Sequence, residues 1–392
     1  MTIQIRTPWR AVSAMFAMNG ALYGMWAARV PAVAERFDLS HAVLGLLLLL
    51  LAGGAIIAFP FAGRAADTRG AARVTLWLAA ANLVGLLLVG AAPSLWFLAP
   101  ALLFFGASHG AMDVTMNTWA TEVERQMGRP VMSSFHAMWS VGTGAGAISG
   151  YLALKGGMEV FSHFLLAGLL FSAVLLWFAN IGWQSDLHPA EEGAKKGPIF
   201  TLPKGILLFA GLMAFGAAMG EGAMADWSAV YMVDVVGVGE ADAALGFTVF
   251  ASAMVVMRLA GDRVIRLFGP VATARGAGCV AFLGALLVVG FASPVMSVTG
   301  FALMGLGYAV IIPIAFTRAA NDPDMSPGRA ISAVSTLSYG GILLGPPLIG
   351  FVAEATSLRF GFGLLAALAL LIIAFAFAVR PVGQLKKPAK AA

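Results

Sequence analysis

The sequence predicts an all-α membrane protein of twelve transmembrane helices in two pseudo-symmetric six-helix bundles, and three observations predict this fold class. First, 60% of the 392 residues are hydrophobic and 11% are charged, with a mean hydropathy of +0.89, whereas soluble domains carry about 25% charged residues. Second, apolar stretches of about 20 residues recur without sustained alternation, which favours helices over barrel strands. Third, the two halves of the chain resemble each other. A soluble enzyme is excluded, because most of the backbone lies at bilayer depth. There, only helices and closed barrels provide hydrogen bonds for all backbone N–H and C=O groups.

The apolar stretches form two sets of six, separated by a polar segment. The first set covers residues 10–32, 41–62, 72–92, 95–121, 131–153 and 158–183. The second set covers residues 205–233, 241–262, 271–292, 294–318, 328–353 and 358–380. Helix-start signals include Ser40 as a cap before the second stretch and Pro130 at the head of the fifth. We therefore expect an N-terminal bundle over 1–184, a cytoplasmic linker over 185–204 and a C-terminal bundle over 205–392.

The two sets are related by a weak internal repeat. A displacement of 200 residues aligns Gly128-Arg129 with Gly328-Arg329, and Gly150-Tyr151 with Gly350-Phe351. These matches fall on the fifth and eleventh stretches, which occupy equivalent places in the two sets. A parallel repeat of two six-helix halves is the architecture of secondary transporters, whose substrate sites lie near the bilayer midplane.

The distribution of charge predicts the orientation of the chain. If the N-terminus is cytoplasmic, twenty of the 24 lysines and arginines, Arg258 among them, fall on the cytoplasmic side, and only Arg29, Arg36, Lys155 and Arg359 fall on the other. Positive residues favour the cytoplasmic side, so we expect both termini there. The net charge of +5 is therefore interpreted as a signal of membrane topology; the expected partner is the lipid bilayer, and no nucleic-acid partner is expected. The single cysteine, Cys279, excludes an internal disulfide.

The loop after the second stretch carries a recognisable motif. Residues 63–73 read GRAADTRGAAR, which resembles the loop motif of major facilitator superfamily transporters, although Thr68 stands at its first basic position. The resemblance covers almost the full chain and implies the fold of that superfamily, with Asp67 as a gating residue. Gly63 and Gly70 would permit close approach and a tight turn. Independently, the N-terminus of the eleventh helix would face this loop, and its dipole would favour the Asp67 carboxylate. The second half holds a looser echo of the motif in Arg258, Gly261, Asp262, Arg263 and Gly269.

Four further segments are similar to a bacterial branch of the superfamily, the MosC/YbjJ-like transporters. These segments are Met25–Pro31, Gly110–Asn117, Ser134–Ser140 and Glu221–Trp227. The resemblance implies a multi-pass protein of the bacterial inner (cytoplasmic) membrane. It also implies a small polar solute, since MosC is associated with rhizopine, an amino-inositol derivative.

Ionisable groups inside a bilayer are costly and mark functional sites. Asp113 lies inside the fourth stretch, and Glu221 and Asp226 lie inside the seventh. Burial disfavours the charged form of a carboxylate, which suits a proton-binding site, so we assign proton coupling to Asp113 and Glu221. Asp226 lies about 140° around the helix from Glu221, and we expect it to pair with Arg29 in a gate or a structural contact.

Polar side chains recur at helical spacing on three of the predicted helices. In the fourth helix, His109, Asp113 and Asn117 share one face. The remaining members of the predicted substrate-binding set are Asn19, Tyr23 and Trp26 in the first helix, and His136 and Ser140 in the fifth. Each of these residues also has a structural interpretation, such as a hydrogen bond to a neighbouring helix or, for the two histidines, to a carbonyl group.

These observations predict a monomeric secondary active transporter, without enzymatic activity, that moves a small polar organic solute by alternating access coupled to protons. The expected solute is sugar-, polyol- or amino-cyclitol-like. Alternatives are a proton-driven exporter of amphipathic drug-like compounds or metabolites, a lipid flippase, and a solute sensor that does not transport. The sequence has no Walker loop, nucleophile elbow or Cys/His cluster, so we expect no cofactor and no metal.

Overall fold

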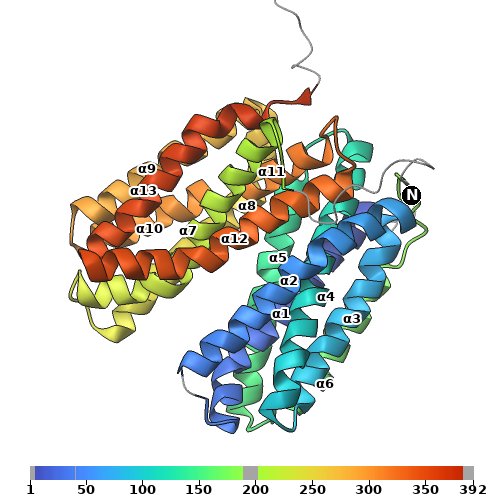
Figure 1. Ribbon diagram of the computed structural model, residues 1–392, viewed down its shortest axis with the longest axis horizontal. Helices are drawn as coiled ribbons and strands as arrows, with labels where there is room; N and C mark the ends of the chain where they lie inside the picture. The colour runs from blue at the N-terminus through green and yellow to red at the C-terminus, as the bar shows by residue number, and fades with distance from the viewer. Residues whose placement is uncertain (1–4, 40, 189–201, 383–392) are drawn as a thin grey trace, which may run out of the picture. The chain divides into compact units, whose positions relative to one another are not determined.

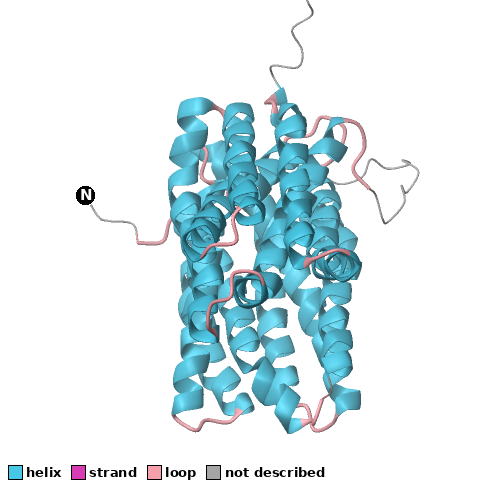
Figure 2. Cartoon of the chain, turned by 90° about the vertical axis from the view of Figure 1, so that its left-hand side faces the viewer, coloured by secondary structure: helices cyan, strands magenta, loops and turns pink. Residues whose placement is uncertain are grey.

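A computed structural model describes residues 5–39, 41–188 and 202–382, and these residues form helices and loops without a β-strand (Figure 2). The helices before the polar segment are α1 (Pro8–Arg36), α2 (His41–Arg69), α3 (Ala71–Ala91), α4 (Leu95–Met127), α5 (Met132–Lys155) and α6 (Val160–Ala179). Those after it are α7 (Ile206–Asp234), α8 (Glu240–Phe268), α9 (Pro270–Gly290), α10 (Pro294–Tyr308), α11 (Ile311–Ala320), α12 (Pro327–Ala355), α13 (Leu358–Phe375) and the short 3₁₀-helix η1 (Ala376–Val379). The Ser40 cap and residues 189–201 of the predicted linker lie outside the described residues.

The chain divides into two compact units, coloured blue to green and yellow-green to red in Figure 1 apart from two short exchanged segments. The first unit comprises Met1–Arg129, Phe135–Thr201 and Ser326–Ser332. The second unit comprises Pro130–Ser134, Leu202–Met325 and Ala333–Ala392. The first turn of α5 therefore packs with the second unit, and the first turns of α12 pack with the first unit.

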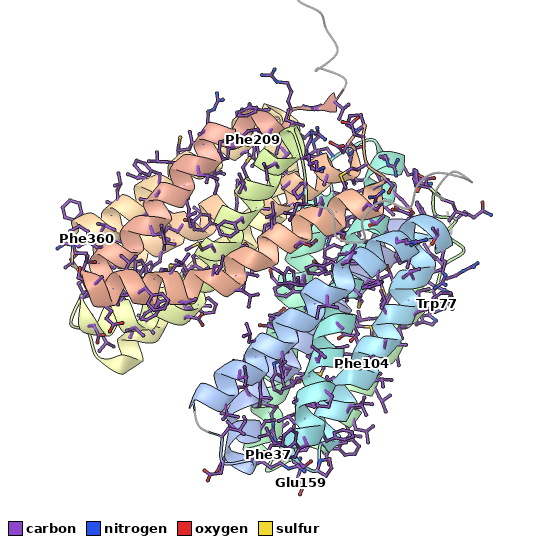
Figure 3. All side chains as sticks on the ribbon, viewed as in Figure 1. Phe37, Trp77, Phe104, Glu159, Phe209 and Phe360 are labelled. Atoms are coloured by element: carbon purple, nitrogen blue, oxygen red, sulfur yellow. The ribbon has the colours of Figure 1, made fainter. Side chains whose placement is uncertain are left out.

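Ten helical segments of the described chain are long and apolar enough to cross a membrane, with α10 and α11 counted together. The predicted spans outside this set are α1 and α5, which carry many of the polar residues discussed below. Large apolar side chains project outward from the helices, Trp77 of α3 and Phe360 of α13 among them (Figure 3). Such apolar outer faces suit contact with lipid, so the chain is a multi-pass membrane protein.

The tenth predicted span is not one continuous helix. The sequence predicts one span over 294–318, and within it α10 ends at Tyr308 and α11 begins at Ile311. Pro313 explains the interruption, because it has no amide hydrogen to donate to the carbonyl group of Ala309 and its ring clashes with that carbonyl. Both pieces belong to one membrane-spanning segment, Pro294–Ala320, so the predicted span is confirmed.

Small residues bring α1 and α5 into backbone contact. A Cβ atom added to Gly142 would overlap the carbonyl oxygen of Ala17, and one added to Gly146 would overlap that of Ala21. Small-residue pairs of this kind allow helices in membranes to pack closely. The close approach determines which side chains of α1 and α5 can reach each other, and so positions the polar residues that these helices carry.

Candidate functional site

The first unit holds a cluster of polar and aromatic side chains from three helices, here called the α1–α4–α5 cluster. Its members are Asn19 and Tyr23 of α1, His109, Asp113 and Asn117 of α4, and His136 and Trp139 of α5. Six of these seven residues belong to the predicted proton-coupling and substrate-binding sets. The structure thus brings most of the predicted site in this half of the chain into one place.

One arm of the cluster joins all three helices through Asn19. The indole Nε1–H of Trp139 donates to Asn19 Oδ1 at 2.9 Å. Asn19 Nδ2 in turn donates to the backbone carbonyl of His109 at 3.2 Å. The Tyr23 ring lies beside the His109 ring, with 5.4 Å between centroids, and 6.1 Å from the Trp139 ring. Because Asn19 is fully buried and both ends of its amide are used, this arm fixes α1 against α4 and α5.

The other arm ends on the carboxylate of Asp113. Asn117 Nδ2 donates to Asp113 Oδ1 at 3.1 Å and to the Asp113 backbone carbonyl at 2.9 Å. Asn117 Oδ1 lies 3.2 Å from His136 Nε2. An amide oxygen can only accept, so this contact requires the proton to be on His136 Nε2. The hydrogen bonds therefore run from His136 through Asn117 to Asp113, and the carboxylate is the final acceptor.

Asp113 is only partly buried and makes no ion pair within the described part of the chain. Its Oδ1 accepts from Asn117, while no hydrogen bond of the described residues reaches Oδ2. A carboxylate inside a membrane protein without a counter-ion is unfavourable unless it faces a cavity or neutralises. Asp113 can therefore bind a proton, or it can accept a hydrogen bond from a hydroxyl or amino group of a solute.

The two other residues of the predicted substrate-binding set are Trp26 and Ser140. Trp26 is 2% exposed and makes none of the contacts that join the cluster. The hydroxyl of Ser140 donates to the backbone carbonyl of His136 at 3.3 Å, one turn earlier in the same helix. Trp139 was absent from the predicted set. Its place three residues after His136 puts the two on one helix face, and that spacing could have identified it.

The second unit holds a different arrangement, an ion pair between α7 and α8. Arg258 Nη2 lies 3.1 Å and 3.2 Å from the two carboxylate oxygens of Glu221. Arg258 is 4% exposed and lies within the membrane-spanning part of α8, Leu245–Phe268. Counting charges assigned Arg258 to the cytoplasmic side, but it could not identify this ion pair, because the counter-ion lies on another helix. Asp226 is exposed on α7, one and a half turns further along the helix.

The structure places Asp67 at the start of α12. Asp67 Oδ1 accepts from the backbone N–H of Gly328 at 2.9 Å, and Oδ2 accepts from the Ser326 hydroxyl at 2.6 Å. The backbones of Gly63 and Gly328 approach so closely that an added Cβ on either would overlap the other's carbonyl oxygen. Gly70, the residue before α3, has a φ of +91°, which favours glycine at this turn. Asp67 therefore caps the α12 N-terminus, whose dipole favours a carboxylate.

The second unit contains an equivalent contact. Asp262, near the end of α8, accepts from the backbone N–H groups of Ser133 and Ser134 at 2.9 Å and 3.0 Å, where α5 begins. Ser133 Oγ also donates to the backbone carbonyl of Arg258 at 2.8 Å. The partial repeat of the loop motif around Asp262 is thus a structural counterpart of the Asp67 loop. Asp262 was absent from the predicted site residues.

Arg29 lies in a buried part of the first unit. It is 3% exposed, and its Nη2 donates to the carbonyl of Met158 at 2.7 Å. Its Nε and Nη1 atoms are buried without a hydrogen bond to any described residue. The predicted pairing of Arg29 with Asp226 would join the two units and stays a prediction.

A duplicated set of membrane-spanning helices, with a capped helix start in each unit and polar side chains inside, defines a secondary transporter. The sequence profile of the Major Facilitator Superfamily matches residues 11–326. The chain belongs to this superfamily.

Three similar proteins agree with this assignment. An uncharacterised transporter of Sinorhizobium fredii (strain NBRC 101917 / NGR234) is 47% identical over 368 residues, which cover 93% of this chain and 97% of the relative. The membrane protein MosC of Rhizobium meliloti is 33% identical and covers 89% of this chain and 84% of its own. A structure of the E. coli fucose:proton symporter FucP has the same fold, with a TM-score of 0.74, 16% identity, and coverage of 96% of this chain and 99% of that one. The chain is a major facilitator transporter of the MosC-like branch.

Proposed function

We propose that this transporter moves a small polar organic solute across the bacterial inner membrane by alternating access, and that the transport is coupled to protons. The observation that carries the proposal is the α1–α4–α5 cluster, in which a partly buried carboxylate is the last acceptor of a hydrogen-bonded chain and makes no ion pair with a described residue. Membrane-embedded carboxylates of this kind commonly mark proton relays.

Asp113 is the first candidate for the proton-binding group. Its interaction with Asn117 is compatible with both protonation states, because the protonated acid keeps an oxygen that can accept from the amide. Glu221 remains a second candidate, but its carboxylate already has Arg258 as a counter-ion. A proton at Glu221 would have to displace that arginine, so its contribution depends on a rearrangement of α7 against α8.

The chemistry of the cluster supports a hydroxylated solute. Amide, carboxylate and imidazole groups provide donors and acceptors, while Tyr23 and Trp139 provide aromatic faces beside them. Such a combination of few polar groups and aromatic walls is typical of sites for small ligands. A sugar-, polyol- or amino-cyclitol-like solute fits this set, and the carboxylate of Asp113 would also suit an amino group. Fucose, the solute in the name of FucP, provides a first compound to test.

The gate residues complete the proposal. Asp67, with Gly63 and Gly70, would hold the start of α12 during one part of the transport cycle, and breaking the capping contact would release it. Arg29 has two buried nitrogen atoms without an acceptor among the described residues, and Asp226 has an exposed carboxylate, so their charges suit a contact formed in another part of the cycle. We also propose that the protein acts as a monomer with both termini cytoplasmic.

Proton movement into proteoliposomes tests the proposal. The full-length protein is reconstituted with a pH-sensitive dye inside and is challenged with fucose, other sugars, polyols, amino-cyclitols, amino acids and lipophilic cations. The variants are Asp113→Asn and Glu221→Gln, and Asp234→Asn at the exposed end of α7 is the matched control. We expect one polar class to drive proton flux in the wild type and in the control, and the Asp113→Asn variant to lose it.

Three outcomes would reject parts of the proposal. Solute uptake without proton movement would leave facilitated diffusion as the function and Asp113 with a structural role. Flux driven only by lipophilic cations would favour the exporter of amphipathic compounds. Solute binding without uptake would favour a sensor.

A further inference from the structure

Outside the α1–α4–α5 cluster, the first unit has a surface pocket of about 450 Å³ at the ends of α3 and α6. Six residues line it: Arg6, Leu76, Ala173, Leu176, Trp177 and Asn180. Arg6 precedes α1, Leu76 lies in the second turn of α3, and Asn180 is the C-cap of α6. The pocket therefore lies at one end of the helices, where a membrane protein passes from hydrocarbon to headgroups.

The wall of the pocket is apolar and continuous with the outer face of the unit. Ala173 and Leu176 come from the last two turns of α6, and Leu76 faces them from α3. Exposed apolar side chains extend this surface along both helices, Trp77 on α3 and Leu170 on α6 among them (Figure 3 labels Trp77). Such a surface accommodates acyl chains, because it offers no polar group with which water or a soluble anion could interact.

The mouth of the pocket is polar and positively charged. The Arg6 guanidinium lies over the Trp177 ring, 5.4 Å from its centroid. Arg6 is exposed and forms no ion pair with a carboxylate of the described chain. Asn180 presents an exposed amide beside it, and Arg73 is exposed in the first turn of α3, where the helix dipole is also positive. The cation is held in place by an aromatic ring but retains its donors for a ligand.

We propose that this pocket binds an anionic phospholipid. Arg6 and Asn180 donate to the phosphate group, Trp177 lies at the level of the interface, and the upper acyl chain lies along Leu76, Ala173 and Leu176. Basic pockets between membrane helices recognise acidic lipid headgroups, and tryptophan is enriched at the same depth. A zwitterionic lipid carries its own ammonium group, so Arg6 adds less to its binding. A water-soluble phosphate would leave the apolar wall uncovered.

Fluorescence quenching by brominated lipids tests this site on the full-length protein. The protein is reconstituted in phosphatidylcholine vesicles that contain an equal minor fraction of brominated phosphatidylglycerol or brominated phosphatidylcholine. Bromine quenches tryptophan on contact, so the difference between the two lipids reports preferential binding of the anionic headgroup. The variants are Arg6→Gln, Trp177→Phe and the matched control Arg266→Gln, which removes an exposed arginine from the last turn of α8.

We expect brominated phosphatidylglycerol to quench more than brominated phosphatidylcholine. One arginine near the headgroups contributes about 1 kcal/mol, so Arg6→Gln should lower the preference about fivefold. Trp177→Phe should remove the part of the quenching difference that depends on Arg6. Arg266→Gln should leave the quenching difference between the two lipids unchanged. Equal quenching by the two lipids, or an excess that survives Arg6→Gln, would overturn the proposal.

Two further arms separate the alternatives. An equal loss in Arg6→Gln and Arg266→Gln would show diffuse attraction to surface charge, and would reject a defined site. Competition by soluble glycerol 3-phosphate would show that the pocket binds a free phosphate ester, and would reject a lipid as the ligand. The proposal requires that glycerol 3-phosphate leaves the quenching unchanged.

Discussion

The two units repeat the same capping contact but carry different chemistry inside. Asp67 in the first unit and Asp262 in the second each accept two hydrogen bonds at the start of a helix, α12 and α5 respectively. Inside, the first unit has a hydrogen-bonded network that ends on Asp113. The second unit has the ion pair of Glu221 and Arg258 instead.

The difference shows which part of a duplicated fold is free to specialise. A carboxylate at a helix start interacts with backbone N–H groups and a dipole, which any sequence supplies. The interior contacts depend on particular side chains from several helices. The contacts at the helix ends are therefore present in both units. Inside, the Asp113 carboxylate of the first unit has no counter-ion among the described residues, whereas the Glu221 carboxylate of the second unit is neutralised by Arg258. The predictions below probe this contrast, from the largest expected effect to the smallest.

Arg258→Met should have the largest effect, because it leaves the Glu221 carboxylate inside the membrane span without a counter-ion. Removing one member of a buried ion pair lowers the free energy of unfolding by about 3 kcal/mol. The double variant Glu221→Gln/Arg258→Met should recover most of that loss. Denaturant titration in detergent, followed by circular dichroism, measures both. Equal stability of the single and double variants would show that the pair is not coupled.

Asp113→Asn should affect transport rather than stability. An amide keeps an acceptor for Asn117 but cannot exchange a proton, so we expect solute-driven proton flux to fall about a hundredfold, equivalent to about 2.7 kcal/mol. The free energy of unfolding should change by less than about 1 kcal/mol. The proteoliposome assay measures the proton flux, and denaturant titration in detergent measures the free energy of unfolding. A large loss of stability with residual flux would assign Asp113 a structural role.

Asp67→Ala and Asp262→Ala should have similar, intermediate effects. Each removes a carboxylate from a helix start, which lowers the free energy of unfolding by about 1–2 kcal/mol. The exposed Asp234→Ala control should stay within about 0.5 kcal/mol of the wild type. If the free energy of unfolding fell much more in one of these variants than in the other, the two capping contacts would not be equivalent.

Trp139→Phe should have the smallest effect. The ring remains, but the donor to Asn19 is lost, which lowers the free energy of unfolding by about 1 kcal/mol. Because Trp139 also lies beside Tyr23 in the proposed substrate site, we expect the apparent affinity for the solute to weaken. Trp96→Phe, at an exposed position of α4, is the control. Unchanged affinity and stability would exclude Trp139 from the site.

Much of the architecture could be predicted from the sequence because hydropathy and helical spacing are local properties. The apolar stretches predicted the helices, and the break before Pro313 follows from a rule that could have been applied to the tenth stretch. The spacing of His109, Asp113 and Asn117 predicted their common face. The place of Asp67 beside the start of α12 followed from counting spans, since equivalent helix ends lie on the same side of the membrane.

The contacts between helices could not be obtained in this way. Spacing alone shows that His136 lies on a face of its helix, but not that this face meets Asn117. Likewise, hydropathy identifies Glu221 as an acid inside a helix, but not Arg258 as its counter-ion. The same spacing grouped Trp26 with Asn19 and Tyr23, whereas the structure leaves Trp26 out of the contacts that join them.

By itself, the sequence determined the membrane environment, the helix order, the internal repeat and the polar residues available inside each half. The tertiary structure decided which of those residues meet. The physical reason is that membrane helices associate through close backbone contacts, such as those of Gly142 with Ala17 and Gly146 with Ala21, whose pairing is a property of two surfaces at once. Those contacts position Asn19 to reach Trp139, and they make one cluster from residues more than a hundred positions apart in the chain.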